Sequence, residues 1–296
     1  MSPMPAGTIA SFPASAFVVD DLVSAKATTG TTVSVCLPAR NEAPTVGAIV
    51  EAIRTTLVDG VPLVDEVLVV DDHSTDGTAA VAAAAGARVI DAATVLAEHG
   101  EGHGKGEALW KGLWSATGDL IAWIDADIVG FDPAFVVGLL GPLLTDPAID
   151  FVKGHYHRPE SGGVGGGRVT ELLARPLLAQ YFPELGGIAQ PLGGEYAGRR
   201  SLLEQLPFVI GYGVDVGLLI DAARATGVDH LAQVDLGRRD HRNRPLDQLG
   251  PQALAVSQTI LERAGCRPPG PATLQRPGHP PVTLDLHERP PLASLR

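Results

Sequence analysis

The apolar segment from Leu120 to Asp127, LIAWIDAD, ends in two carboxylates one residue apart. A short apolar run that stops in polar residues predicts a buried strand. Open α/β sheets bind ligands at their carboxyl edge, so Asp125 and Asp127 are expected at a binding site. Residues i and i+2 of a strand point to the same side. The pair is therefore expected to hold one divalent cation or a cation-bound diphosphate.

An alternation of strands and helices surrounds this segment. The hydrophobic pattern predicts strands at 33–38, 64–70 and 87–90. It predicts helices at 46–57 and 105–114, and between them an alanine-rich helix that ends at residue 85. Such an order predicts an α/β fold with a mainly parallel sheet covered by helices on both faces. Three strand ends then meet at one edge and form a single site: residues 38–42, Asp71 with Asp72, and the Asp125–Asp127 pair.

The second half of the chain is less regular. It predicts strands at 151–156 and 230–235, and helices at 168–181, with a kink at Pro176, at 215–225 and at 250–264. We divide the chain into an N-terminal arm (1–29), a regular half (30–145), a less regular half (146–265) and a proline-rich tail (266–296). The tail is expected to be extended, and either packed along the surface or disordered.

Charge and cysteine content exclude several functions and compartments. The net charge of −12 argues against nucleic acid as the main partner, but a local basic pocket can still bind a phosphorylated small molecule. Cys36 and Cys266 lie far apart and outside any metal-type spacing, which favours a reducing cytoplasm. The N-terminus has no signal-like apolar core, and the longest apolar segment is too short to span a bilayer.

Two stretches of the less regular half favour anion binding. A glycine run leads into a predicted helix whose first turn carries Arg168 and Thr170, which combines free backbone N–H groups with a guanidinium. A flexible linker is the alternative. His241 lies among the arginines of 238–244 in a chain that is otherwise acidic, and a solvated loop is the alternative for this cluster.

Several motifs together resemble the glucosyl-3-phosphoglycerate synthases, a family of retaining, metal-dependent glycosyltransferases with the GT-A (Rossmann-like) fold. The general ones are PARNE (38–42), DDHSTDGT (71–78), GKGEALW (104–110) and the Asp-x-Asp motif. The narrower ones are GGRVTEL (166–172), QPLGGEYAG (190–198) and DHRNRP (240–245). The resemblance covers residues 31 to 264. It implies that the regular half binds the nucleotide sugar and the less regular half binds the acceptor.

The resemblance also implies a role for individual residues. The nucleoside pocket would be lined by Pro38, Ala39, Arg40, Glu42 and Asp72. Lys105, Asp125 and Ala126 would contact the ribose and diphosphate. Asp127 and His241 would bind Mg²⁺ or Mn²⁺, and this mixed ligand set suits manganese at least as well as magnesium. The phosphate and carboxylate of 3-phosphoglycerate would be held by Gly167, Arg168, Thr170, Arg239 and Asn243.

The implied reaction moves glucose from a nucleoside diphosphate, with UDP-glucose expected, to the 2-hydroxyl of 3-phosphoglycerate. The metal and Lys105 would stabilise the leaving diphosphate. The backbone carbonyl of Leu192 would assist a front-face attack. Asp215 stands where the resemblance implies a glutamate that binds sugar hydroxyls, which leaves glucose or mannose open. A homodimer is also implied.

Other functions remain to be weighed against this one. The nearest is a mannosyl-3-phosphoglycerate synthase that uses GDP-mannose. Glycosyltransferases acting on polyprenyl phosphate or polysaccharide usually bring membrane helices or basic amphipathic segments, which this sequence lacks. A nucleotide-binding regulatory protein without catalysis is the non-enzyme alternative. A dehydrogenase is disfavoured because no G-x-G-x-x-G follows the first strand.

Overall fold

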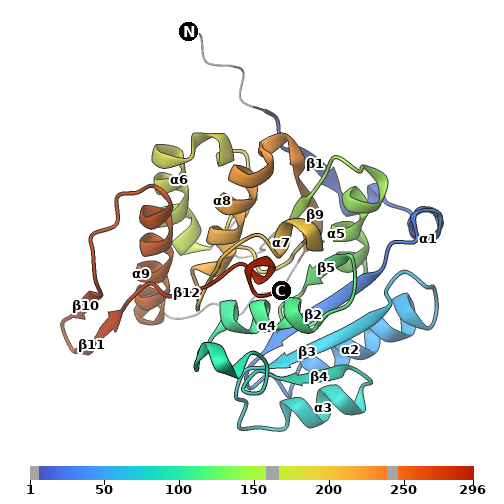
Figure 1. Ribbon diagram of the computed structural model, residues 1–296, viewed down its shortest axis with the longest axis horizontal. Helices are drawn as coiled ribbons and strands as arrows, with labels where there is room; N and C mark the ends of the chain where they lie inside the picture. The colour runs from blue at the N-terminus through green and yellow to red at the C-terminus, as the bar shows by residue number, and fades with distance from the viewer. Residues whose placement is uncertain (1–6, 158–166, 239–245) are drawn as a thin grey trace.

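A single mixed sheet of eight strands forms the centre of the molecule (Figure 1). The structure, a computed structural model, describes residues 7–157, 167–238 and 246–296. All neighbouring strands run parallel except β7, which is antiparallel to both of its neighbours. In spatial order the strands are β1 (Ala10–Pro13), β9 (Leu231–Arg238), β6 (Phe151–His157), β7 (Tyr196–Arg199), β5 (Leu120–Trp123), β2 (Val33–Ala39), β3 (Glu66–Asp71) and β4 (Arg88–Asp91).

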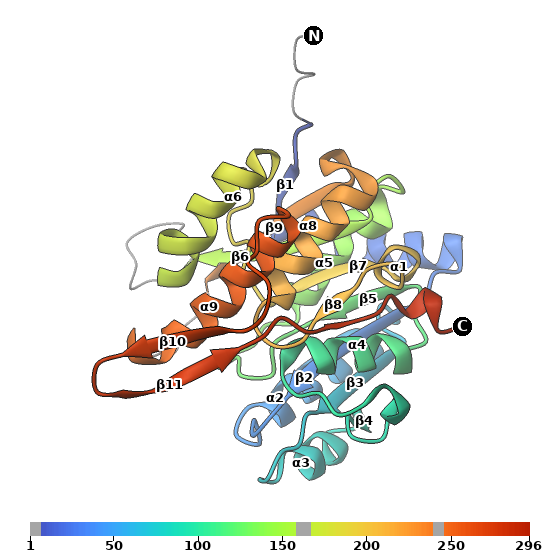
Figure 2. The same cartoon turned by 60° about the vertical axis from the view of Figure 1, so that its left-hand side comes forward.

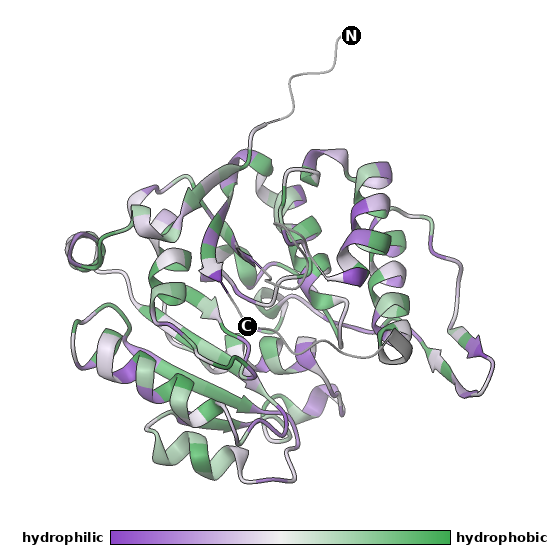
Figure 3. Cartoon of the chain, turned by 180° about the vertical axis from the view of Figure 1, so that it is seen from behind, coloured by the Kyte–Doolittle hydropathy of each residue, from purple (hydrophilic) through white to green (hydrophobic). Residues whose placement is uncertain are grey.

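Helices cover both faces of the sheet because its strands alternate two apolar surfaces. Val33, Val35 and Leu37 of β2 pack into one core, and Cys36 packs into the other. Figure 3 shows how strongly hydrophobic the strands of the regular half are. The first core receives α1 (Val19–Thr29), α2 (Val46–Ile53), α3 (Thr78–Ala84) and α5 (Ala134–Thr145). The second receives α4 (Lys105–Ser115), α6 (Arg175–Tyr181), α7 (Arg200–Leu203), α8 (Val214–Thr226) and α9 (Leu246–Arg263).

The helices follow the predicted apolar spacing. In α2, Val46, Ile49, Val50 and Ile53 are all buried, and full burial of each such side chain stabilises the fold by roughly 1.5–3 kcal/mol. The stripe continues through Leu57 in a π-helical turn at Arg54–Val58. A second π-helical turn, Thr170–Ala174, precedes α6, whose first turn contains Pro176. The helical segment predicted at 168–181 therefore changes its winding between Ala174 and Arg175, just before Pro176, and the kink predicted at Pro176 stays a prediction.

The described part of the N-terminal arm belongs to the fold. β1 pairs with β9 at the sheet edge, and Leu22 of α1 is buried in the core. Phe17, between them, packs directly over Gly141 of α5, where any Cβ atom would collide with its ring. Close packing of this kind fixes the arm on α5.

The proline-rich tail is ordered, so the disordered alternative is wrong. It forms a hairpin of β10 (Ala272–Arg276) and β11 (His279–Leu284), and then returns across the molecule as β12 (Glu288–Arg289) (Figure 2). β12 pairs antiparallel with β8 (Phe208–Val209). The short strands β7 and β8 were not predicted either. Among the described residues, no helix has both the length and the apolarity needed to cross a membrane.

Candidate active site

The ammonium group of Lys105 lies between two carboxylates that come from distant parts of the chain. Lys105 is the first residue of α4, and its Nζ lies 2.8 Å from Asp125 Oδ1 and 3.1 Å from Asp215 Oδ1. Asp125 follows β5, and Asp215 lies in the first turn of α8. These contacts join the two halves of the chain at the carboxyl edge of the sheet, where a ligand site was predicted.

The electrostatics of this cluster keep Lys105 charged. Burial alone would lower the pKa of Lys105, but the negative charges of Asp125 and Asp215 outweigh burial and raise that pKa above its ordinary value. The Lys105 side chain is 16 % exposed, so a ligand that enters from solvent can reach its ammonium group. The two carboxylates already hold this group in position. Such a fixed cation stabilises negative charge without reorganising first.

A glycine-rich loop closes over Asp125. The backbone of Gly194 approaches so closely that a Cβ atom there would collide with the Asp125 carboxylate. The loop begins with a turn in which the Gly193 N–H donates to the carbonyl of Gln190 at 3.0 Å, which places Leu192 inside the turn. Leu192 is half-buried and packs on the second core. Lys153 of β6 holds the loop in place by donating a 2.6 Å hydrogen bond to the Gly193 carbonyl.

Lys153 is buried and was missed by our sequence analysis. Its ammonium lies 4.3 Å from the centre of the Tyr196 ring, and burial lowers its pKa to about 8. The signal that could have revealed it is a lysine in the middle of an otherwise apolar strand, because an unpaired buried charge is too costly to keep without a role.

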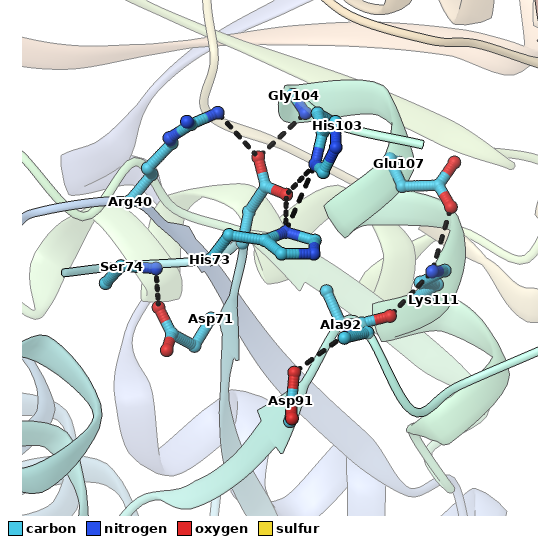
Figure 4. A network of polar contacts seen from close by, with 12 residues as sticks. Arg40, Asp71, His73, Ser74, Asp91, Ala92, His103, Gly104, Glu107 and Lys111 are labelled. Carbon is cyan, nitrogen blue, oxygen red and sulfur yellow. Dashed lines mark hydrogen bonds and ion pairs between the residues drawn. The ribbon is translucent and has the colours of Figure 1, made fainter. Parts of the chain in front are cut away.

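Asp72 forms the second part of the site, at the end of β3. Its side chain is 4 % exposed, and its Oδ2 accepts a 2.7 Å hydrogen bond from the Gly104 N–H at the start of α4. Arg40 lies 3.8 Å from the same oxygen, and the Asp72 N–H donates to the Ala39 carbonyl. In Figure 4, dashed lines from the labelled Arg40 and Gly104 mark their contacts with Asp72 Oδ2. The structure thus brings together the ends of β2 and β3 and the N-terminus of α4.

The last residues of β2 and the residues that follow it also lie at this edge. Pro38 and Glu42 are half-buried and Ala39 is buried, whereas Arg40 is exposed. The Glu42 N–H donates to Thr78 Oγ1 at 2.8 Å, which ties the segment to α3. Arg40 is thus an exposed cation beside the buried Asp72 carboxylate, and a nucleoside pocket here stays a prediction.

Asp125 and Asp127 occupy different environments. β5 ends at Trp123, two residues earlier than predicted, so strand alternation does not extend to this pair. Asp125 turns inward to Lys105, Ala126 is buried with its carbonyl accepting from Thr45 Oγ1, and Asp127 is exposed. An exposed carboxylate beside the Lys105 cluster fits a divalent cation that a diphosphate also binds. Its predicted partner His241 lies outside the described residues.

The predicted acceptor residues are described only in part. Gly167 begins the helical segment, its carbonyl accepts from the Glu171 N–H at 3.0 Å, Arg168 is exposed and Thr170 is buried. Arg239 and Asn243 lie outside the described residues. The place of Arg168 and Thr170 in the site therefore stays a prediction.

Comparisons with known proteins agree with this architecture. Residues 34–211 match the family model "Glycosyl transferase family 2". The chain is 50 % identical to the glucosyl-3-phosphoglycerate synthase of Mycolicibacterium smegmatis, over 95 % of this chain and 94 % of that protein.

Solved structures are similar over nearly the whole chain. Crystal structures of the Mycobacterium tuberculosis glucosyl-3-phosphoglycerate synthase hold Mn²⁺, UDP-glucose and phosphoglyceric acid in one case, and Mg²⁺ and UDP in another. Their TM-scores are 0.88 and 0.87, both at 44 % identity, and they cover 98 % and 97 % of this chain and 100 % and 99 % of theirs. The mannosyl-3-phosphoglycerate synthase of Rubrobacter xylanophilus has a TM-score of 0.88 at 40 % identity, with 97 % and 96 % of the two chains covered.

Proposed function

Because the chain belongs to glycosyl transferase family 2, and within it to the glucosyl-3-phosphoglycerate synthases, we propose that the Lys105 cluster is the centre of its glucosyl transfer. The enzyme is a hexosyltransferase with the GT-A fold that moves glucose from UDP-glucose to 3-phosphoglycerate and uses Mg²⁺ or Mn²⁺. The observation that carries the proposal is the position of Lys105 between Asp125 and Asp215.

Lys105 stabilises the departing diphosphate in this proposal. Cleavage of the bond between glucose and phosphate leaves negative charge on the diphosphate, and a preoriented ammonium lowers the barrier by meeting that charge. Its raised pKa keeps Lys105 protonated throughout the physiological pH range. Asp125 holds the lysine in place and faces the nucleotide. Asp72, with Pro38, Ala39, Arg40 and Glu42, binds the nucleoside.

Asp127 and His241 are the proposed protein ligands of the divalent metal. The exposed carboxylate of Asp127 is a hard oxygen donor of the kind that Mg²⁺ and Mn²⁺ bind. When bound, the metal supplies a Lewis acid that neutralises diphosphate charge.

The acceptor is oriented by the less regular half, 146–265. Arg168, Thr170 and the Gly167 backbone would bind its phosphate, and Arg239 and Asn243 its carboxylate and phosphate. The Leu192 carbonyl would accept a hydrogen bond from the attacking 2-hydroxyl, since the Gln190–Gly193 turn and Lys153 hold this segment in place. Attack from the face of the leaving group would retain the anomeric configuration.

Asp215 is the proposed contact for the sugar hydroxyls and is shared with Lys105. It is a shorter acid than the glutamate that the family resemblance implies at this position. We propose that its ion pair with Lys105 fixes the carboxylate for glucose. The mannosyl rival predicts a preference for GDP-mannose, because sugar discrimination depends on contacts of this kind.

A donor competition with the purified full chain tests the function. UDP-glucose and GDP-mannose, together with 3-phosphoglycerate and Mn²⁺, should yield glucosyl-3-phosphoglycerate as the main product by mass spectrometry. Dominant formation of the mannosyl product would overturn the glucose assignment. Lys105→Met should lower kcat/KM about 100- to 1,000-fold, as for other groups that stabilise transition-state charge. Lys105→Arg should retain part of the activity if charge is what matters.

Assembly and compartment complete the proposal. A homodimer is proposed from the family resemblance, and sedimentation at equilibrium tests it. A reducing cytoplasm is proposed because Cys36 and Cys266 are both free thiols, one buried and one exposed.

A further inference from the structure

Three side chains beside Gly104 point their ligand atoms at a common centre. His73 Nδ1 lies 3.0 Å from Asp72 Oδ1 and 3.2 Å from His103 Nδ1, and His103 Nδ1 lies 3.9 Å from the same Asp72 oxygen. Figure 4 shows the two imidazole rings meeting from different segments. Among the described residues, Asp72, His73 and His103 form a group whose ligand atoms all lie within 4.8 Å of one another.

Hydrogen bonds alone do not account for this arrangement. An imidazole Nδ1 carries either one proton or one lone pair, so His73 Nδ1 cannot direct full hydrogen bonds to both Asp72 and His103. Ligand atoms that surround one tetrahedral Zn²⁺ ion at about 2.1 Å lie about 3.4 Å from one another. The three observed separations bracket that value, and a cation at the centre would satisfy all three atoms at once.

The surrounding backbone holds the three residues in place. His73 has a φ of 60°, in the left-handed region that costs a non-glycine residue energy and persists only where neighbours enforce it. The Ser74 N–H donates to Asp71 Oδ1 at 3.2 Å and stabilises this turn. On the other side, the Gly104 N–H binds Asp72 Oδ2, which leaves Oδ1 directed at the two histidines. Hydrogen bonds to the outer oxygen of a carboxylate are typical of metal ligands.

We propose that Asp72, His73 and His103 form a second metal site, for a borderline divalent ion such as Zn²⁺. Two imidazoles and one carboxylate select Zn²⁺, Co²⁺, Ni²⁺ or Cu²⁺ rather than Mg²⁺, which prefers an all-oxygen shell. His103 is 51 % exposed and His73 is 34 % exposed, so water can supply the fourth ligand. Its three ligands are different residues from the proposed cofactor ligands Asp127 and His241.

A metal here has a consequence that rests on the proposed function. Asp72 is assigned there to the nucleoside pocket, and a bound ion would occupy its Oδ1 and place positive charge beside Arg40. Zn²⁺ is therefore an inhibitor that competes with UDP-glucose while the catalytic Mg²⁺ or Mn²⁺ is saturating. The nucleoside and the ion cannot both use the same carboxylate oxygen.

Metal titration of the full chain tests the site without any substrate. Zn²⁺ alone is titrated calorimetrically into an Asp127→Ala background, which removes a ligand of the proposed cofactor site. His73→Gln and His103→Gln are added separately, and His279→Gln, an exposed histidine on the tail hairpin, is the matched control. Thermal unfolding without metal shows whether each variant is folded.

Each of the two histidine substitutions should weaken Zn²⁺ binding about 10- to 100-fold or more, since even changes in the outer shell of a site have effects of that size. The control should leave the affinity unchanged. Co²⁺ should give the intense visible absorption of a four-coordinate ion, and the same two variants should lose it. Equal Zn²⁺ affinity in all folded variants would overturn the site.

Inhibition kinetics then test the placement of the site. With Mg²⁺ saturating, Zn²⁺ should raise the KM for UDP-glucose and leave kcat unchanged, and His103→Gln should relieve the effect. Inhibition that UDP-glucose does not overcome would overturn the competition, even where the titration supports a metal site. A chain that binds Zn²⁺ as proposed but transfers no glucose would instead refute the proposed function.

Discussion

Arg289 Nε lies 2.6 Å from Glu107 Oε2, and the two residues are 182 positions apart in the chain. A second guanidinium nitrogen lies 2.9 Å from Oε1, and the same group donates to the carbonyls of His99 and Gly100. Glu107 is fully buried and also pairs with Lys111 at 2.9 Å. Trp110 adds a hydrogen bond to the Pro290 carbonyl at 2.9 Å. The tail thus fixes the first turns of α4, which carry Lys105.

Arg289→Ala should therefore destabilise the enzyme and weaken donor binding. Removing one partner of a buried ion pair costs about 3–5 kcal/mol when the other charge is left unpaired, and because Glu107 keeps Lys111 we expect about 3 kcal/mol here. The free energy of unfolding in urea should fall by this amount, and the KM for UDP-glucose should rise because Gly104 and Lys105 lose their support. Arg296→Ala is the matched control, since Arg296 is half-exposed and its ion pair with Glu204 should contribute at most about 1 kcal/mol. Equal effects of the two substitutions would contradict this role for the tail.

Gly194→Ala should lower activity without unfolding the protein. A methyl group at this position collides with the Asp125 carboxylate and would push it away from Lys105. We expect kcat/KM to fall about 100-fold, as a displacement of about 1 Å in an active site can cause. Gly187→Ala is a suitable control, because a Cβ atom there meets nothing within 4 Å. Wild-type kcat/KM in folded Gly194→Ala would show that the close approach is unimportant.

Lys153 should make stability increase with pH above neutrality. Burial lowers the pKa of Lys153 in the folded protein to about 8, from an ordinary value of 10.5. Between these values the unfolded chain binds more protons than the folded chain, so the free energy of unfolding rises with pH, by a total of about 3 kcal/mol at most. The raised pKa of Lys105 acts in the opposite direction, but only as pH rises above its unfolded value.

Urea unfolding at a series of pH values measures this dependence. Lys153→Met should remove the increase between pH 8 and 10.5. A variant that keeps the wild-type slope would assign the pH dependence to another group.

The two cysteines should differ sharply in reactivity. Burial raises the pKa of Cys36 to about 12, whereas Cys266 is exposed. Because the thiolate is the reactive form, a thiol reagent at pH 8 should modify one equivalent in the native protein and two in urea. Cys266→Ser should leave no fast-reacting thiol. Rapid modification of two native thiols would show that β2 opens readily.

The grouping of several polar residues at one edge of the sheet could be predicted from local patterns. Arg40, Asp72, Lys105 and Asp125 each follow a strand or begin a helix in a regular alternation, and parallel strands bring such ends to one edge. Asp215 was expected as a sugar contact, but its ion pair with Lys105 was not, because the order of β5, β7 and β6 cannot be deduced from short irregular strands. β7 runs antiparallel between β5 and β6, but it has only four residues, which is too short to give a clear strand pattern in the sequence.

The tail shows a different limit. Its prolines favour extended backbone, and this prediction agrees with strands β10 and β11. The local sequence around Arg289 does not indicate, however, that this residue pairs with Glu107. Such a pairing depends on the shape of the finished sheet and on a buried carboxylate elsewhere in the chain. The acid inside α4 was itself the available signal, since a buried Glu needs a cationic partner.

The ion pair between Arg289 and Glu107 can form only late in the synthesis of the chain. A ribosome adds residues in sequence, so Glu107 and its helical partner Lys111 are synthesised long before Arg289, the second cation that pairs with Glu107. The nascent sheet can pair β2, β3 and β5 early, as the N-terminal parts of chains usually fold first. The start of α4 nevertheless lacks its ion pair with Arg289 until β12 has been synthesised. The last contact that fixes Lys105 at the start of α4 is therefore expected to form only after the C-terminal residues have been synthesised.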